Sequence, residues 1–105
     1  MEVSQKLIDK INSTIRDVQD FPKKGIVFKD ITPILKNAEL SKEINKELAN
    51  HFPSQVTHIA GIESRGFLFG FPCAIERDIA FVLIRKKGKL PFKTVSYQYD
   101  LEYGS

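Results

Sequence analysis

Residues 56–84, VTHIAGIESRGFLFGFPCAIERDIAFVLI, decide the fold of this chain. The runs at 56–62 and 79–84 are rich in β-branched residues and nearly all apolar, which predicts two strands buried on both faces. The segment 67–76 between them predicts a helix, although Pro72 requires that helix either to kink or to start late. A strand, a helix and a strand within about thirty residues form a βαβ unit with a right-handed crossover. The predicted fold class is therefore α/β, with a Rossmann-like parallel sheet.

The residues before this unit predict further helices. Apolar side chains at helical spacing indicate an N-terminal helix over residues 1–20, which ends where Pro22 denies its predecessor the helical conformation. The apolar stripe of this helix consists of Val3, Leu7, Ile8, Ile11, Ile15 and Val18. Asp30 or Thr32 is expected to cap a short helix, and Ser41 is expected to cap a longer one.

The composition is that of an ordinary folded domain. The chain has 105 residues, which is enough for one small domain. Its net charge of +3 is too small to indicate a nucleic-acid binder by itself. No apolar run reaches the roughly 18 to 20 residues of a membrane-spanning helix, and the N-terminus lacks the apolar region of a secretory signal. Cys73 is the only cysteine, so we expect a core residue in a protein of the reducing cytoplasm.

Two polar segments follow the predicted strands at one edge of the sheet. Glu63-Ser64-Arg65-Gly66 comes after the first strand, and a basic run comes after the second. The basic run contains Arg85, Lys86, Lys87 and Lys89, with Lys93 a little further on. In α/β folds ligands bind beyond the carboxyl ends of the strands, where helix N-termini favour anions. The pattern favours a multiply charged phosphate ligand. Taken alone, the turn is more often an ordinary capped turn than a ligand site, and many basic runs are simply solvated surface.

Four motifs in order resemble the adenine phosphoribosyltransferases. They are FPKKGIVFKDITPIL at 21–35, GIESRGFLFG at 61–70, RKKGKLP at 85–91 and YDLEYG at 99–104. The resemblance implies the α/β fold of the type I phosphoribosyltransferase core, as a single domain over 1–105 that stops before the last strands. Its parts would be an N-terminal helix at 1–20, a base-binding hood at 21–35, the βαβ core at 55–85 and a flexible catalytic loop at 86–105.

The resemblance also implies a role for each motif. The adenine-binding residues would be Ile26, Val27, Phe28 and Lys29, with Phe28 stacking on the base. The pyrophosphate-binding residues would be Glu63, Ser64, Arg65, Arg85, Lys86 and Lys89, in a loop that in this family often contains a cis peptide. The catalytic residues would be Arg65, Glu102, which would assist proton transfer at the purine, and Tyr103, which would close over the site. No side chain is expected to be a metal ligand.

The reaction implied by the resemblance belongs to purine salvage. It joins adenine to 5-phosphoribosyl-1-pyrophosphate and yields AMP and pyrophosphate, with Mg²⁺ bound together with the phosphoribosyl donor. Catalysis would consist of stabilising the departing pyrophosphate, excluding water and placing the base against the sugar carbon. The complete enzyme would be a cytoplasmic homodimer that binds neither membrane nor nucleic acid.

The chain departs from the family pattern in one large respect. The resemblance implies two aspartates and a Thr-Gly-Gly-Thr turn that hold the ribose 5-phosphate, and the sequence ends before them. We therefore expect the front part of an enzyme. The alternatives are an inactive fragment that binds adenine or pyrophosphate, and an interaction protein that needs a partner chain. A nucleic-acid binder is an alternative of another class, because aromatic residues are interleaved with lysines in the basic loop.

Overall fold

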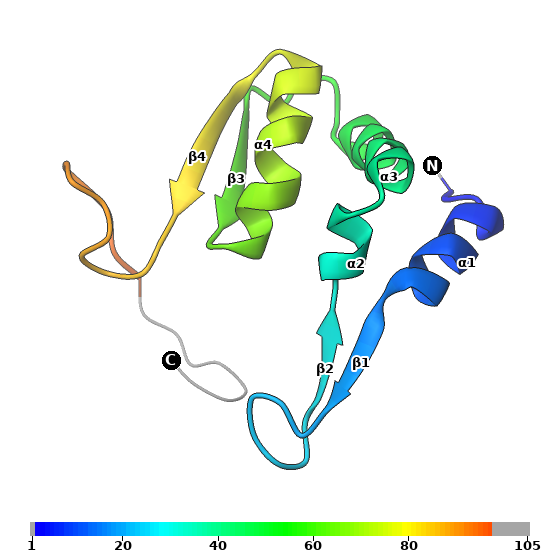
Figure 1. The fold of residues 1–105 in the computed structure, drawn as a ribbon. Helices are drawn as coiled ribbons and strands as arrows, with labels where there is room; N and C mark the ends of the chain where they lie inside the picture. The colour runs from blue at the N-terminus through cyan, green and yellow to red at the C-terminus, as the bar shows by residue number, and fades with distance from the viewer. Residues whose placement is uncertain (1, 98–105) are drawn as a thin grey trace.

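The computed structural model describes residues 2–97 and arranges them as a layer of helices, a βαβ unit and a projecting hairpin (Figure 1). The helices are α1 (Gln5–Thr14), α2 (Thr32–Leu35), α3 (Ala38–His51) and α4 (Arg65–Arg77). The strands are β1 (Arg16–Gln19), β2 (Val27–Asp30), β3 (His58–Ile62) and β4 (Ala80–Ile84). Among residues 2–97, no helix combines the length and the apolar character that crossing a membrane requires.

The predicted βαβ unit is confirmed. β3 and β4 pair in parallel, with His58 opposite Ala80 at the first pair, and α4 packs on both strands. The prediction that both faces of the strands are buried is wrong for the described residues. In β3 only Ile59 and Gly61 are buried, because α4 covers one side of this two-stranded sheet. Val82 on β4 remains 44% exposed.

α4 starts earlier than the sequence predicts and continues through its proline. The helix begins at Arg65 rather than near Phe67, and Pro72 lies inside it. Because Pro72 has no backbone N–H, the carbonyl of Leu68 loses its helical partner. The late start that Pro72 could have required is therefore not found.

α4 approaches β3 at a distance that requires glycine. A Cβ atom on Gly61 would lie 2.5 Å from the Phe81 ring and 2.6 Å from the carbonyl oxygen of Gly66. A Cβ atom on Gly70 would lie 2.5 Å from the same ring. Both separations are shorter than any real carbon contact, so Phe81 from β4 occupies the space that these glycines leave open.

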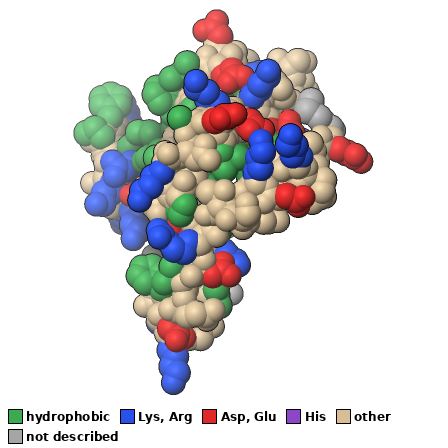
Figure 2. Space-filling view, turned by 45° about the vertical axis from the view of Figure 1, so that its right-hand side comes forward, with side chains coloured by type: hydrophobic (Ala, Val, Ile, Leu, Met, Phe, Trp, Pro, Cys, Tyr) green, Lys and Arg blue, Asp and Glu red, His purple; other side chains and the backbone are tan. Residues whose placement is uncertain are grey.

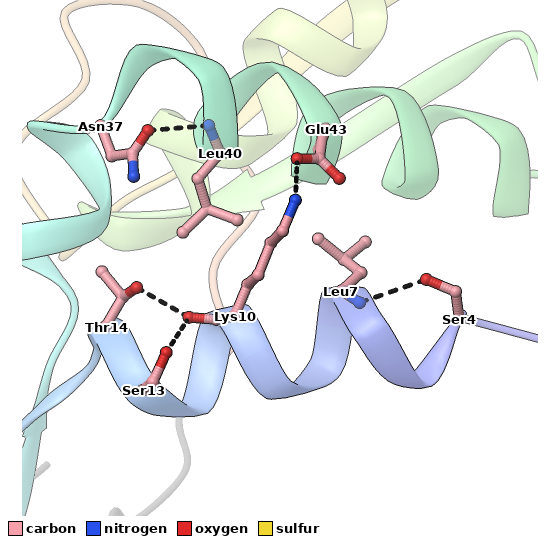
Figure 3. Close-up of polar contacts among 8 residues, drawn as sticks. All are labelled: Ser4, Leu7, Lys10, Ser13, Thr14, Asn37, Leu40 and Glu43. Carbon is pink, nitrogen blue, oxygen red and sulfur yellow. Dashed lines mark hydrogen bonds and ion pairs between the residues drawn. The ribbon is translucent and has the colours of Figure 1, made fainter.

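The helical layer has its own apolar core between α1, α2 and α3. The buried members of this core are Leu7, Ile34, Leu40 and Ile44. On the surface, Lys10 Nζ of α1 donates to Glu43 Oε1 of α3 at 3.0 Å and bridges the two helices (Figure 3). Since this ion pair is partly exposed, most of the stabilisation between the helices comes from the apolar core.

Side chains cap the N-termini of α1 and α3. Ser4 Oγ accepts a hydrogen bond from Leu7 N at 3.2 Å, and Asn37 Oδ1 accepts one from Leu40 N at 3.0 Å (Figure 3). The prediction that Ser41 caps the long helix is wrong, since α3 already begins at Ala38 and Asn37 is its cap. Asparagine is as good a cap as serine, which is why the sequence allowed both starts.

Arg77 at the end of α4 joins this helix to the C-terminal end of α3. Its guanidinium donates to the carbonyl oxygens of Ala49 at 2.6 Å, Phe52 at 2.7 Å and Pro53 at 3.0 Å. Carbonyls at a helix C-terminus lack helical partners, so Arg77 satisfies them.

The core between α3, α4 and β3 consists of Ala49, Ile59, Cys73 and Ala74. Cys73 is buried, which confirms it as a core residue, and its burial raises the pKa of the thiol.

β1 and β2 form an antiparallel hairpin that projects from the body of the molecule (Figure 1, Figure 2). The expected helix over residues 1–20 is wrong in its second half, because α1 ends at Thr14 and Ile15 turns into extended backbone. The main chain from Arg16 onward then pairs with Val27–Asp30. β2 lies within the range expected for the hood, residues 21–35, whereas β1 lies before that range.

We predict that Gly61→Ala and Gly70→Ala each lower the free energy of unfolding by about 1–3 kcal/mol, because the added methyl group overpacks the contact with Phe81. Urea unfolding measures this change. In a Phe81→Leu background the cost of Gly70→Ala should shrink, because its clash is with the ring alone. The cost of Gly61→Ala should persist there, because the Gly66 carbonyl still blocks the methyl group. Equal relief of both variants would contradict the packing described here.

Candidate active site

The turn between β3 and α4 lies at the carboxyl edge of the parallel sheet, as predicted. A cis peptide bond joins Glu63 to Ser64, and Arg65 and Gly66 begin α4. Ser64 occupies the N-cap position, yet its side chain makes no capping hydrogen bond. The positive end of the helix dipole therefore faces this turn without a serine cap, which is an arrangement suited to an anion.

A hollow of about 640 Å³ opens along β3 and reaches this turn. Its walls come from Leu48 and Phe52 of α3, from the end of β3 and from the first half of α4. All four turn residues, Glu63 to Gly66, line it, whereas Phe28 of the hairpin does not. The hollow therefore extends the turn along the sheet and leaves the hairpin outside.

Glu63 connects the turn to the end of β4. Its backbone N–H donates to the carbonyl oxygen of Ile84 at 2.9 Å, and its carboxylate Oε1 accepts a hydrogen bond from the backbone N–H of Lys86. Oε2 lies 3.6 Å from a guanidinium nitrogen of Arg85. The Lys86 hydrogen bond, and then the charges of Arg85 and Lys89, lower the pKa of Glu63 from its ordinary value.

Arg85 is held on three sides. Besides Glu63, its guanidinium lies 5.9 Å from the centre of the Phe67 ring and donates to the carbonyl oxygen of Lys89 at 3.4 Å. Lys86 and Lys89 close a turn, since Lys89 N donates to Lys86 O at 3.1 Å. The structure thus brings Glu63, Arg85 and Lys86 together at one edge of the sheet. In Figure 2, Lys and Arg side chains are spread over the visible face, and one of them lies at its lower tip.

Arg65 reaches from the turn to the hairpin. Its guanidinium carbon lies 5.3 Å from the centre of the Phe28 ring, in a cation–π contact. Phe21 packs edge-on against the same ring at 5.0 Å between centres. Phe28 is therefore in contact with the turn between β3 and α4 through Arg65 and is supported within the hairpin by Phe21.

The other expected adenine-binding residues lie on the hairpin beside Phe28. Ile26 precedes β2, and its carbonyl oxygen accepts a hydrogen bond from Phe21 N at 3.1 Å. Val27 is 45% exposed, and Lys29 pairs with Asp17 across the hairpin at 2.7 Å. The Lys29 side chain thus points to the neighbouring strand β1 rather than to the turn between β3 and α4.

Asp30 anchors the base of the hairpin. Its Oδ1 accepts hydrogen bonds from Thr32 N and Thr32 Oγ1, and its Oδ2 accepts two from the Arg16 guanidinium, at 2.7 and 3.0 Å. The backbone hydrogen bond from Thr32, followed by the side-chain bonds from Arg16 and Thr32, lowers the pKa of Asp30 to about 2. Ile31 occupies the N-cap position of α2 and no side chain caps it, so the prediction that Asp30 or Thr32 caps this helix is wrong. Asp30 precedes the cap and binds Thr32, the first helical residue, instead.

Two expected catalytic residues, Glu102 and Tyr103, lie outside the described residues. So does part of the expected catalytic loop, residues 98–105. Across 2–97, no three His, Cys, Asp or Glu side chains form a group that could hold a metal ion.

No protein-family model matches the chain. The chain is 48% identical to a protein from Cytophaga hutchinsonii named adenine phosphoribosyltransferase, over 107 residues that cover 100% of this chain and 59% of that protein. A Methanococcus maripaludis protein of the same name is 53% identical over 96 residues, which cover 90% of this chain and 56% of the relative. The chain belongs to the adenine phosphoribosyltransferase family. It spans 59% and 56% of the length of these two relatives.

Solved adenine phosphoribosyltransferases share the fold. The Thermoanaerobacter pseudethanolicus enzyme matches with a TM-score of 0.84 and 49% identity, over 92% of this chain and 57% of its own. The Giardia lamblia enzyme, solved with 9-deazaadenine, matches with a TM-score of 0.87 and 37% identity, over 92% and 54%. The Trypanosoma brucei enzyme, solved with AMP, pyrophosphate and ribose-5-phosphate, matches with a TM-score of 0.84 and 25% identity, over 99% of this chain and 47% of its own. The α/β fold with a parallel sheet that the sequence predicts is therefore confirmed.

The sequence did not predict three contributors to this candidate site. They are the Arg16–Asp30 pair that anchors the hairpin, the Phe21 ring behind Phe28, and the Lys86 amide bound by Glu63. Only the first had a local signal, because Asp30-Ile31-Thr32-Pro33 is typical of a helix start. The other two join residues from different elements and have no periodic signature.

We predict that Asp30→Ala lowers the urea midpoint at pH 7, because it removes the hydrogen bonds to Thr32 and the Arg16 pair. The pKa of Asp30 is lowered in the folded protein, so its contacts stabilise the fold above the ordinary pKa of 3.8 and are lost as the pH falls toward about 2. The difference between wild type and Asp30→Ala should therefore vanish between about pH 4 and pH 2.

Asp17→Ala is the matched control, since Asp17 pairs with Lys29 on the exposed surface of the same hairpin. It should shift the urea midpoint little at any pH. A constant gap between wild type and Asp30→Ala down to pH 2 would contradict the assigned role of the carboxylate.

Proposed function

We propose that the protein acts in purine salvage by transferring phosphoribosyl from 5-phosphoribosyl-1-pyrophosphate to adenine, giving AMP and pyrophosphate. One observation carries the proposal: Arg65, in the anion-facing turn, lies over the ring of Phe28 in the hood. An aromatic platform for a flat base thus borders an N-terminal helix end suited to a phosphate. Transfer between a base and a phosphorylated sugar needs these two surfaces side by side.

In this proposal the hood binds adenine. Phe28 stacks on the base, and the backbone groups around Val27 and Lys29 read its edge. Backbone N–H and C=O groups suit adenine, because its ring nitrogens accept and its amino group donates hydrogen bonds. The adenine analogue in the Giardia lamblia structure supports this choice of base.

The turn and the basic run then bind the pyrophosphate of the donor. The first-turn amides of α4 and the side chain of Arg65 face the anion, and Arg85, Lys86 and Lys89 add positive charge at the same edge. Cations that lie close to the departing pyrophosphate lower the barrier, since negative charge builds up there in the transition state. Arg65 contributes to catalysis in this way.

Mg²⁺ belongs to the proposal as a companion of the donor. Residues 2–97 offer no cluster of acidic or thiol ligands for an ion, and a pyrophosphate supplies the oxygen ligands that Mg²⁺ prefers. When bound, the metal neutralises charge on the leaving group. Glu102 and Tyr103 remain predictions for proton transfer and for closure over the site.

The complete enzyme is proposed to be a cytoplasmic homodimer. Exposed apolar side chains of α4 support a further interface, because Leu68, Phe71 and Ile75 are 48%, 52% and 64% exposed. The single buried cysteine agrees with a reducing compartment.

We predict that the 105-residue chain binds adenine more tightly than hypoxanthine, with amide chemical-shift changes at Ile26–Lys29 and Arg65. Phe28→Leu should weaken adenine binding about five-fold or more, because a stacking face is lost. Phe71→Leu is the matched control, since it makes the same change on α4, away from the hood. Equal affinities for wild type and Phe28→Leu would remove the stacking role.

We also predict that these 105 residues alone form no AMP from adenine and the phosphoribosyl donor. The chain covers 59% and 56% of the length of two relatives. We infer that the part of the relatives that it does not cover binds the ribose 5-phosphate, so the donor would not be held in line with the base. An assay with radiolabelled adenine detects the product. AMP formed in proportion to purified chain would show that the chain needs no further residues for turnover.

A further inference from the structure

The carboxylate of Glu63 stands among cations at the place proposed for an anion. The charged groups that act on it are Arg85 and Lys89 from the segment after β4, which also supplies the backbone N–H of Lys86. Arg65 follows two residues later on α4. A negative charge beside a pyrophosphate site repels the ligand. Its presence there calls for a compensating role.

We propose that Glu63 is a positioning residue that holds the basic segment, residues 85–89, in place for pyrophosphate without contacting the anion itself. The proposal rests on the proposed function for its ligand. The observation behind it is that the two oxygens of the Glu63 carboxylate have different partners. Oε1 accepts a hydrogen bond from the Lys86 amide, and Oε2 faces the Arg85 guanidinium.

The basic segment needs such an anchor because it belongs to no helix or strand. It is a surface turn in which Gly88 has a φ of +86°, and its side chains are exposed. Ordering a long cationic side chain on binding costs conformational entropy, which weakens affinity. A carboxylate that fixes the backbone at Lys86 removes part of that cost before the ligand arrives.

The backbone at Glu63 makes the carboxylate a good anchor. Glu63 N donates to Ile84 O, so the residue continues the hydrogen-bonded ladder of β3 and β4. Its side chain then clamps the residues that follow β4. Arg85 is further confined by the Phe67 ring of α4, which sets the direction of its guanidinium.

Positioning and simple charge make opposite predictions for one variant. Removing the charge in Glu63→Ala should tighten pyrophosphate binding if the carboxylate only repels the ligand. It should weaken binding if the carboxylate holds the basic segment. Glu63→Gln separates the two effects, because its amide oxygen can still accept from Lys86 N while the charge is absent.

The first test is made on the ligand-free 105-residue chain by NMR. The Lys86 amide proton should shift with pH as Glu63 titrates, with a midpoint below the ordinary glutamate pKa. Glu63→Gln should abolish the titration, and Glu63→Ala should also speed hydrogen exchange at Lys86 about ten-fold or more. A Lys86 amide that shows no titration and exchanges at the same rate in Glu63→Ala would overturn the proposal.

The second test is calorimetric titration with pyrophosphate. We expect Glu63→Ala to weaken binding about five- to ten-fold, with Glu63→Gln between it and wild type. Glu39→Ala is the control, because it makes the same charge change at an exposed residue of α3 and should leave the affinity unchanged. Tighter binding by Glu63→Ala would overturn the proposal. If wild type binds no pyrophosphate, the proposed function fails, and the Lys86 titration still confirms or overturns the anchor.

Discussion

The close packing of α4 on β3 is the constraint on which the rest of the structure depends. Gly61 and Gly66 meet backbone to backbone, and Phe81 fills the space left by the missing side chains. This contact determines how far the N-terminal end of α4 stands from the carboxyl end of β3. The length and direction of the turn that contains Glu63 and Arg65 follow from it. A larger residue at Gly61 would change the site through packing alone, without touching any charged group.

Contacts with a neighbouring element also hold the C-terminal end of α4. Arg77 binds carbonyl oxygens at the end of α3, and α3 packs in turn on α1 and α2. The helix therefore connects the layer that carries the hairpin with the sheet that carries the basic run. Arg65 and Glu63 lie where these two parts meet, which explains why one turn can contact both Phe28 and Lys86.

The sequence predicted the parts of the fold that depend on local patterning. The βαβ unit follows from two β-branched runs around a helical segment, and the anion-facing turn follows from its place after the first run. The start of β1 could not be predicted in this way. Val18 continues the helical spacing of α1, and only pairing with Phe28 on β2 makes the backbone extended there. Tertiary contact overrides the local pattern at this point.

The same limit applies to the candidate site. Arg65, Arg85 and Lys86 stand out in the sequence because charged side chains follow buried strands. That Glu63 binds the Lys86 amide, 23 residues away in the chain, depends on the parallel register of β3 and β4. The hairpin adds a consequence of another kind. A two-stranded ribbon is marginally stable by itself, so β1 and β2 will open locally more often than the βαβ unit and their amides will exchange sooner. Such opening would separate Phe28 from Arg65 without any change in the βαβ unit.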